Sequence, residues 1–312
     1  EASREDPIDF VVITAPNRVH YPAGKAFLAK GISVMCEKPL TTSSSEALEL
    51  KELASRNNCL FCVAYAYAAH VMVKEARELI RGGLIGDVIT VQGEYPQEWL
   101  IDTLEKADQR QAAWRTDPNK AGISNCVGDI GTHIEHMVAC MTGLKIEKLC
   151  ANLEIIGDGR SLDTNANIML KYSNGASGHY WCSQVAVGYD NGLRVRIFGT
   201  KGAIEFDQEK SNYLRVTLKG QPPQTYSRGN GYISAAAASF SRVPSGHPEG
   251  YHEAFANMYR AFAAALEAKA QGEPIVEADY DYPQIEEGID GVRFIEKCVE
   301  SSSRGAIWVN MN

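Results

Sequence analysis

Three mainly apolar stretches near the start of the chain predict buried β-strands. They span residues 8–14, 32–36 and 59–65, lengths that are typical of strands. Near-continuous apolar runs of this kind indicate parallel strands that helices cover on both faces. The pattern therefore predicts a parallel sheet of the α/β type in the first part of the chain.

Residues typical of helix ends lie between these stretches. Pro22 stands where a first helix would begin and Gly31 where it would end, because proline favours the first turn and glycine the position past the last. Ser43 followed by Glu46 forms a capping box, which predicts a second helix to about Ser55. The alternation of strands and helices predicts a first domain over residues 1–70.

Beyond residue 70, strands follow one another with few helices between them. Predicted strands cover residues 88–95, 149–156, 166–172, 178–183, 194–199, 203–207 and 213–218. Predicted helices cover 73–81, 129–141, 253–271 and 285–301, and the Gly-, Pro- and Ser-rich range 221–250 is predicted to be a long loop. We expect a second, α+β domain over residues 71–312, with an open, mainly antiparallel sheet and helices on one face.

Composition narrows the classes of partner. The 312 residues carry a net charge of −8, with 45% hydrophobic and 22% charged residues. These values describe a globular protein and argue against nucleic acid and anionic membrane surfaces as partners. No apolar run approaches the roughly 18 residues of a membrane-spanning helix.

Eight cysteines are scattered along the chain, several of them in apolar stretches. Cys59 and Cys62 have the spacing of a redox pair, but residues three apart in a strand point to opposite faces. We interpret both as buried thiols, which favours a reducing, cytoplasmic location.

Two short motifs carry side chains that could move a proton. Lys38 follows the second predicted strand, and ligands bind at the carboxyl ends of strands in open α/β sheets. Asp129 and His133 are four residues apart, hence on one face of the predicted helix. If the three groups converge on one cleft, they can take a proton from an alcohol. From these residues alone, an exposed lysine and a helix-surface ion pair stay open as alternatives.

Three ordered motifs resemble those of the glucose–fructose oxidoreductase/inositol dehydrogenase (Gfo/Idh/MocA) family. They are Thr14-Ala15-Pro16-Asn17-Arg18-Val19-His20, Glu37-Lys38-Pro39 and Gly128-Asp129-Ile130-Gly131-Thr132-His133. Ranges 114–118 and 246–251 look like signatures of a subgroup. The resemblance implies a Rossmann domain followed by an open-sheet domain. It also implies oxidation or reduction of a sugar or cyclitol with NAD or NADP.

The chain departs from the family pattern at several points. Family members begin with a strand, a glycine-rich turn and a helix, which bind the cofactor pyrophosphate and which would lie upstream of Glu1. We therefore expect a partial Rossmann-like sheet here, within a longer protein. Tyr67 and Ala68 stand where relatives commonly have arginines, and His136 stands where many have aspartate.

The resemblance implies that Lys38, Asp129 and His133 are catalytic. Lys38 would donate a hydrogen bond to the reacting hydroxyl and stabilise charge on its oxygen. An unperturbed imidazole titrates near pH ~6.5, which suits His133 as the general base, although a lysine base relayed through His133 stays open. Asp129 could set the tautomer of His133 or contact a substrate hydroxyl. No metal is expected, because no third ligand accompanies His133 and His136.

The resemblance also implies which residues contact the cofactor and the substrate. Those expected beside the cofactor are Pro16, Asn17, His20, Glu37, Lys38 and Pro39. Asn17 could instead be a turn residue, and His20 could cap the helix predicted at Pro22. Those expected beside the substrate are Trp114, Arg115, Asp129, His133 and His247. Tryptophan could stack on the apolar face of a sugar, and arginine could bind its hydroxyls.

These residues predict an NAD(P)-dependent dehydrogenase acting on a secondary alcohol of a sugar, anhydrosugar or cyclitol. One alternative is a family member that cleaves glycosides or epimerises through a keto intermediate with bound NAD. Another is a non-catalytic binding protein without the cofactor domain. The sheet face that no predicted helix covers suggests a homodimer or homotetramer.

Overall fold

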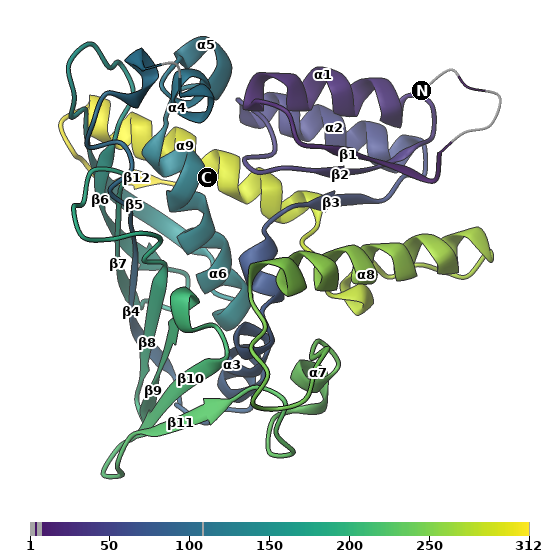
Figure 1. Cartoon of the computed structure of the whole chain (residues 1–312), viewed down its shortest axis with the longest axis vertical. Coiled ribbons are helices and arrows are strands. Elements are labelled where there is room, and N and C mark those ends of the chain that lie inside the picture. Colours follow the sequence, from purple (N-terminus) through teal and green to yellow (C-terminus); the bar gives the residue numbers. More distant parts are fainter. Residues whose placement is uncertain (1–3, 5–7, 108, 312) are drawn as a thin grey trace.

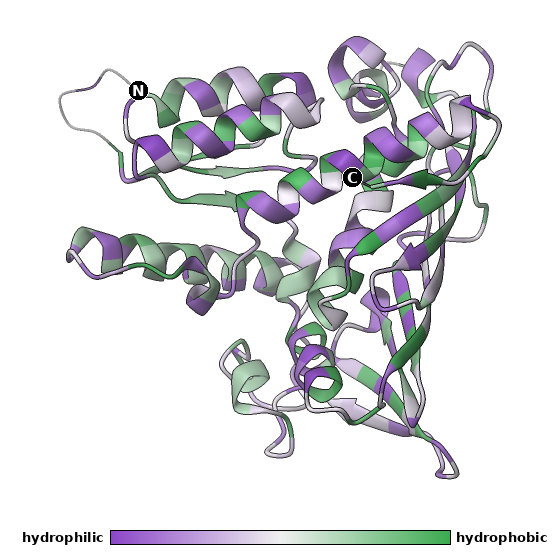
Figure 2. Ribbon diagram, turned by 180° about the vertical axis from the view of Figure 1, so that it is seen from behind, coloured by the Kyte–Doolittle hydropathy of each residue, from purple (hydrophilic) through white to green (hydrophobic). Residues whose placement is uncertain are grey.

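The computed structural model describes residues 4, 8–107 and 109–311, which form two β-sheets with helices packed around them (Figure 1). The first sheet is parallel, in the order β1-β2-β3, with β1 at Phe10–Ile13, β2 at Ser33–Cys36 and β3 at Phe61–Val63. Helices α1 (Asn17–Leu28) and α2 (Ser44–Arg56) cover one face of this sheet, and α8 (Tyr251–Ala270) covers the other. The three strands are predominantly hydrophobic, whereas the helices alternate between hydrophobic and hydrophilic residues (Figure 2). The predicted partial Rossmann-like sheet is confirmed.

The boundaries of the first two helices test the predicted signals. The N-cap half of the predicted capping box is confirmed, since the Ser43 hydroxyl accepts a hydrogen bond of 3.4 Å from the amide of Glu46. The Glu46 carboxylate accepts from the amide of Thr42 at 3.2 Å, so the returning bond is displaced by one residue. The predicted start at Pro22 is wrong, because α1 begins at Asn17 and Pro22 lies inside it. Pro22 has no N–H to donate to the backbone carbonyl of Arg18, four residues earlier in α1. Both residues are exposed, so water can solvate that carbonyl.

The second sheet has nine strands in the order β11-β10-β9-β8-β4-β7-β6-β5-β12. Their bounds are β4 Val88–Pro96, β5 Ile146–Glu154, β6 Asn165–Tyr172, β7 Ser177–Ser183, β8 Arg194–Gly199, β9 Gly202–Asp207, β10 Tyr213–Leu218, β11 Gln224–Ser227 and β12 Val309–Asn310. Only β4 and β7 run parallel among the described neighbouring pairs, so the predicted mainly antiparallel character is confirmed.

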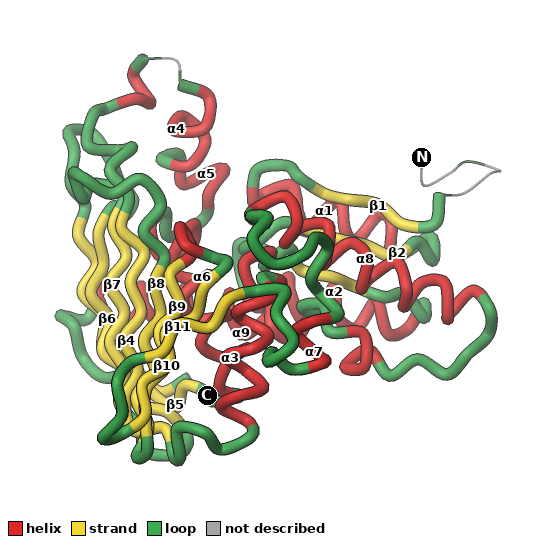
Figure 3. Tube along the Cα trace, turned by 60° about the horizontal axis from the view of Figure 1, so that its bottom comes forward, coloured by secondary structure: helices red, strands yellow, loops and turns green. Residues whose placement is uncertain are grey.

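One face of the second sheet carries the helices. Helices α3 (Val71–Arg81), α6 (Thr132–Thr142) and α9 (Ile285–Ser303) lie against it, and in the described part of the chain the opposite face carries no helix (Figures 1 and 3). This confirms the predicted one-sided open sheet. Helices α8 and α9 also return to the first sheet, where Phe262 packs edge-on against Phe10 with ring centres 5.4 Å apart.

The range 221–250 is more ordered than the sequence predicted. It contains β11, which pairs with β10, and the short helix α7 (Ala235–Ala238), whose first turn is capped by the Ser234 hydroxyl. The interpretation as one long loop was wrong, because pairing with β10 and packing of α7 against α3 outweigh the turn-forming composition. Two further short helices, α4 (Arg110–Arg115) and α5 (Pro118–Ala121), precede α6.

The remaining compositional predictions can be checked against burial. Cys59 and Cys62 are buried free thiols, as predicted. In residues 4, 8–107 and 109–311, no helix combines the length and apolar character that crossing a membrane requires.

Close approach of α6 to the sheet depends on Gly93 in β4. A Cβ atom built there would lie 2.2 Å from Cγ2 of Ile134, which is fully buried on α6. We expect Gly93→Ala to lower the free energy of unfolding by about 1–3 kcal/mol, the usual cost of overpacking a core. Denaturant unfolding measures this change. Gly231→Ala is the matched control, since no heavy atom lies within 4 Å of its added Cβ, and a loss equal to that of Gly93→Ala would contradict the packing argument.

Candidate active site

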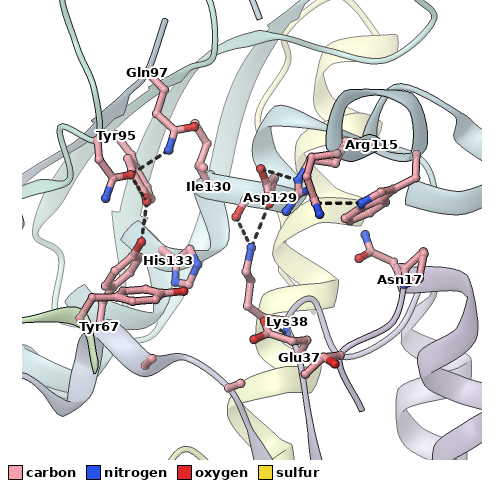
Figure 4. A pocket seen from close by; sticks show the side chains of 18 of the residues that line it. Asn17, Glu37, Lys38, Tyr67, Tyr95, Gln97, Arg115, Asp129, Ile130 and His133 are labelled. Carbon is pink, nitrogen blue, oxygen red and sulfur yellow. Dashed lines mark hydrogen bonds and ion pairs between the residues drawn. The ribbon is translucent and has the colours of Figure 1, made fainter. Parts of the chain in front are cut away.

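A polar cavity of about 580 Å³ lies at the carboxyl ends of the strands of the first sheet. Residues that follow β1, β2 and β3 line one side, and residues from β4, α4, α6 and α8 line the other. The cavity therefore lies between the parallel sheet and the elements that cover the second sheet. Its lining includes most of the residues that the sequence motifs singled out, and Figure 4 shows them converging.

Lys38 and Asp129 form the ion pair at the centre of this cavity (Figure 4). The ammonium of Lys38 donates hydrogen bonds to Oδ1 of Asp129 at 3.0 Å and to the backbone carbonyl of Asp129 at 2.7 Å. Both side chains are largely buried, with 13% and 15% of their surfaces exposed. Such a partly buried pair is screened by salt much less than an exposed one.

The helix that carries Asp129 begins with an irregular turn. Residues Val127–Gly131 are π-helical, and α6 continues regularly from Thr132. The predicted single helix over 129–141 therefore has a widened first turn. A π turn disrupts the regular i to i−4 bonding and is frequent at functional sites, and the carbonyl of Asp129 in this turn accepts the bond from Lys38.

Arg115 approaches Asp129 from the side opposite Lys38. Its Nε donates to Oδ2 of Asp129 at 3.1 Å, and its guanidinium lies 4.2 Å from the ring centre of Trp114. Burial raises the pKa of the Asp129 carboxyl, but the nearby charges of Lys38 and Arg115 outweigh burial and hold that pKa well below its usual range. Asp129 is therefore ionised at every ordinary pH.

His133 lies beside the ion pair with its ring available to a ligand. Its ring nitrogens make no hydrogen bond within the described residues, and the ring packs against Tyr67 at 4.7 Å between centres. Burial, reinforced by the charge of Lys38, lowers the pKa of His133 well below its ordinary value. The imidazole is thus neutral near pH 7. The hydrogen bonds of Asp129 run to Lys38, Arg115 and Gln184 rather than to His133, so Asp129 does not set the tautomer of His133 by a direct bond.

The residues expected beside a cofactor divide into two groups. Pro16, Asn17, Glu37 and Lys38 line the cavity, and burial raises the pKa of the Glu37 carboxyl while Lys38 opposes the rise. His20 is fully buried and does not line the cavity.

His20 instead connects two loops beside the site. Its ring nitrogens lie 2.9 Å from the carbonyl oxygen of Pro39 and 2.8 Å from that of Ala15. His20 therefore ties the end of β1 to the end of β2, which is a supporting position and not a helix cap. Pro39 likewise lies outside the cavity lining.

Several lining residues were not identified from the sequence as site residues. The hydroxyls of Tyr67 and Tyr95 lie 2.9 Å apart, and Tyr95 donates to Oδ1 of Asn191 at 2.7 Å. Gln97 donates to the same oxygen at 2.8 Å. We call Tyr67, Tyr95, Gln97 and Asn191 the tyrosine–amide wall. In the sequence Tyr67 is only a departure from the family pattern, and the other three carry no local signal. The wall forms because the fold brings the end of β4, with Tyr95 and Gln97, next to Tyr67 after β3 and Asn191 before β8.

Of two residues that the sequence predicted beside the substrate, Trp114 lines the cavity and His247 does not. Trp114 lines the cavity next to Arg115 on α4. His247 is exposed and does not line the cavity, and its backbone carbonyl accepts a hydrogen bond from the buried Arg228. The same loop instead leads to Tyr251, which lines the cavity at the start of α8.

Comparison with known proteins agrees with this architecture. The model described as "Oxidoreductase family, NAD-binding Rossmann fold" matches residues 1–65, and that described as "GFO/IDH/MocA C-terminal domain" matches residues 73–205. The chain belongs to the Gfo/Idh/MocA family. The resemblance drawn from the three sequence motifs is therefore confirmed, and members of this family are oxidoreductases.

Individual members of the Gfo/Idh/MocA family resemble nearly the whole chain. The uncharacterized oxidoreductase YfiI of Bacillus subtilis is 38% identical over 312 residues, which cover 99% of this chain and 79% of YfiI. An inositol dehydrogenase homolog of Azotobacter vinelandii, solved with NADH and myo-inositol, superposes with a TM-score of 0.93 at 34% identity, covering 99% of this chain and 79% of that one. The levoglucosan dehydrogenase of Pseudarthrobacter phenanthrenivorans is 27% identical over 238 residues, 69% of this chain and 59% of the enzyme.

Proposed function

We propose that this protein is an NAD(P)-dependent dehydrogenase that acts on a secondary alcohol of a sugar, anhydrosugar or cyclitol. The observation that carries the proposal is the meeting of Lys38, Asp129 and His133 around one polar cavity. The relative solved with NADH and myo-inositol supports the cofactor and the class of substrate.

The cavity residues fit the nicotinamide half of such a cofactor. The cavity adjoins the carboxyl ends of parallel strands, where dinucleotides bind in doubly wound sheets. Pro16, Asn17 and Glu37 would lie beside the bound group, and the imidazole of His133 leaves its hydrogen-bonding capacity free for a ligand. When bound, nicotinamide supplies the acceptor or donor of the hydride.

Lys38 and His133 have complementary roles in this proposal. The Asp129 carboxylate aims the ammonium of Lys38, so that Lys38 donates a hydrogen bond to the reacting hydroxyl oxygen and stabilises charge there. The neutral His133 accepts the hydroxyl proton in the oxidation direction and returns it in the reduction direction. Because Lys38 is engaged with a carboxylate, we favour His133 as the base.

The polar lining favours a substrate with several hydroxyls. The tyrosine–amide wall, Arg115 and Asp129 offer donors and acceptors on different sides of the cavity. A site of this kind rejects analogues that lack a hydroxyl, since the buried partner groups would be left unpaired.

The experiment is a screen of the full-length protein with NAD⁺ and NADP⁺ against sugars, anhydrosugars and cyclitols. Net formation of reduced cofactor, followed by absorbance, together with a ketone product is the expected result. Cleaved or epimerised product without net reduced cofactor would favour chemistry through a bound keto intermediate. If the protein showed no turnover and bound no cofactor, the result would contradict an enzyme and favour a non-catalytic binding protein.

The uncovered face of the second sheet supports association with a second copy of this chain. It presents the exposed side chains of Met169 and Tyr213 around a central group of ion pairs that includes Arg194 and Asp207. Flat exposed sheet faces with apolar residues are common self-association surfaces. Light scattering of the full-length protein should give a dimer or tetramer, and a monomer at micromolar concentration would contradict this part of the proposal. The free, mostly buried thiols support a cytoplasmic location.

A further inference from the structure

Asp129 has a third partner, which comes from the second sheet. Gln184, immediately after β7, is fully buried, and its Nε2 donates to Oδ2 of Asp129 at 3.0 Å. This oxygen therefore accepts two hydrogen bonds, one from Gln184 and one from Arg115. Gln184 does not line the cavity, so among the described residues Asp129 is its link to the reacting groups.

Asn125 determines which end of the Gln184 amide faces Asp129. The Nδ2 group of Asn125, also buried, donates to Oε1 of Gln184 at 2.6 Å. The Gln184 oxygen is thereby occupied, and its NH₂ group is left to point at the carboxylate. The backbone of Gln184 is held as well, because its amide donates to Thr164 at 2.8 Å and its carbonyl accepts from Leu100 at 2.9 Å.

The position of Asn125 is itself fixed by a buried carboxylate. Asp163 accepts hydrogen bonds from the backbone amides of Asn125 and Val127, at 3.0 and 2.9 Å, and from the Ser124 hydroxyl at 3.0 Å. These are the residues that lead into the π turn carrying Asp129. A continuous set of hydrogen bonds therefore runs from Asp163 through Asn125 and Gln184 to Asp129.

We propose that Gln184 is a positioning residue, which keeps Asp129 turned toward Lys38 and so aims the ammonium at the substrate. Removal of its N–H leaves Oδ2 of Asp129 with Arg115 as its remaining donor among the described residues. Asp129 can then rotate toward Arg115, and Lys38 loses its alignment. This inference rests on the proposed dehydrogenase function, because it assigns the support of that same site.

The decisive variant is Gln184→Glu, which keeps the shape and exchanges the N–H donor for a carboxyl. When protonated, Glu at this position can still donate to Asp129 and accept from Asn125. When ionised, it repels Asp129 at hydrogen-bond distance, and burial next to a second carboxylate raises its pKa. We expect kcat near the wild-type value at acidic pH and a 10- to 100-fold decrease as pH rises, with little change in KM.

Two further variants separate positioning from structural damage. Gln184→Met removes the donor without adding a charge, and should lower kcat about 10- to 100-fold at every pH, as loss of a hydrogen bond to a charged group predicts. Asn257→Asp is the matched control, a buried amide that accepts from Arg242 and does not line the cavity. It can lower stability, but should not produce a new descending limb in the pH–rate profile.

A second readout does not depend on turnover. The raised pKa of the new carboxyl in folded Gln184→Glu means that the folded state binds more protons than the unfolded state. Its melting temperature should therefore fall relative to wild type as pH rises from about 5 to 8. Wild-type-like pH profiles of both kcat and stability in Gln184→Glu, or full activity of Gln184→Met, would overturn the positioning role. An inactive wild-type enzyme would refute the proposed function, while the stability profile would still test the Gln184–Asp129 contact.

Discussion

Replacing Lys38 by alanine should lower kcat of the full-length enzyme by about 10²- to 10³-fold or more, while cofactor affinity changes only a few-fold. The magnitude follows from losing a preorganised donor to the reacting oxygen. The variant also leaves Asp129 without the ammonium that bonds both its carboxylate and its backbone carbonyl, so its pKa rises. Cofactor affinity is spared because Lys38 is aimed at Asp129 and the cavity centre.

Steady-state kinetics and a cofactor titration measure these two effects separately. Lys25→Ala is the matched control, because Lys25 forms an exposed ion pair with Glu49 on the surfaces of α1 and α2 and should tolerate the change. Wild-type turnover in Lys38→Ala would remove Lys38 from the mechanism. Loss of cofactor binding without loss of turnover at saturating cofactor would move it to a binding role.

The pH dependence of kcat/KM should report the depressed pKa of His133. His133 acts as a base in its neutral form, which predominates at every pH above its pKa in the folded protein. Burial and the charge of Lys38 place that pKa well below 6.5. Activity should therefore stay level as pH falls from 8 to about 6.5, and the acidic limb should appear only below that value. In His133→Asn, that limb should vanish and kcat should fall about 10²- to 10⁴-fold, the usual contribution of a general base.

The measurement is a pH–rate profile of wild type, His133→Asn and the control His252→Asn, which changes an exposed histidine on α8. An acidic limb with an apparent pKa at or above 6.5 would contradict a buried neutral base next to an ammonium. An unchanged limb in His133→Asn would assign that titration to another group.

The sequence predicted much of the fold because its strongest signals are local. Apolar runs identify the three strands of the first sheet, and the Ser43–Glu46 box identifies the start of α2. The Lys38, Asp129 and His133 motifs identified the groups that the fold brings to one cavity. In each case a short segment carries enough information without its tertiary partners.

What the sequence did not predict depends on contacts between distant segments. The predicted helix start at Pro22 is wrong because no local pattern shows that Pro22 lies at an exposed position inside α1, where the loss of one backbone hydrogen bond is tolerated. The π turn before Thr132 and the support from Gln184 both depend on packing against β7 and on Asp163. The tyrosine–amide wall likewise joins β4 to segments remote from it in the sequence.

A crystal structure of the full-length protein with the reduced cofactor and a substrate identified by the screen would locate the reacting hydroxyl. That oxygen should lie within hydrogen-bond distance of both the Lys38 ammonium and the His133 imidazole, with its carbon facing the nicotinamide ring. A substrate bound elsewhere, or a hydroxyl that reaches neither side chain, would show that these groups do not form a catalytic centre.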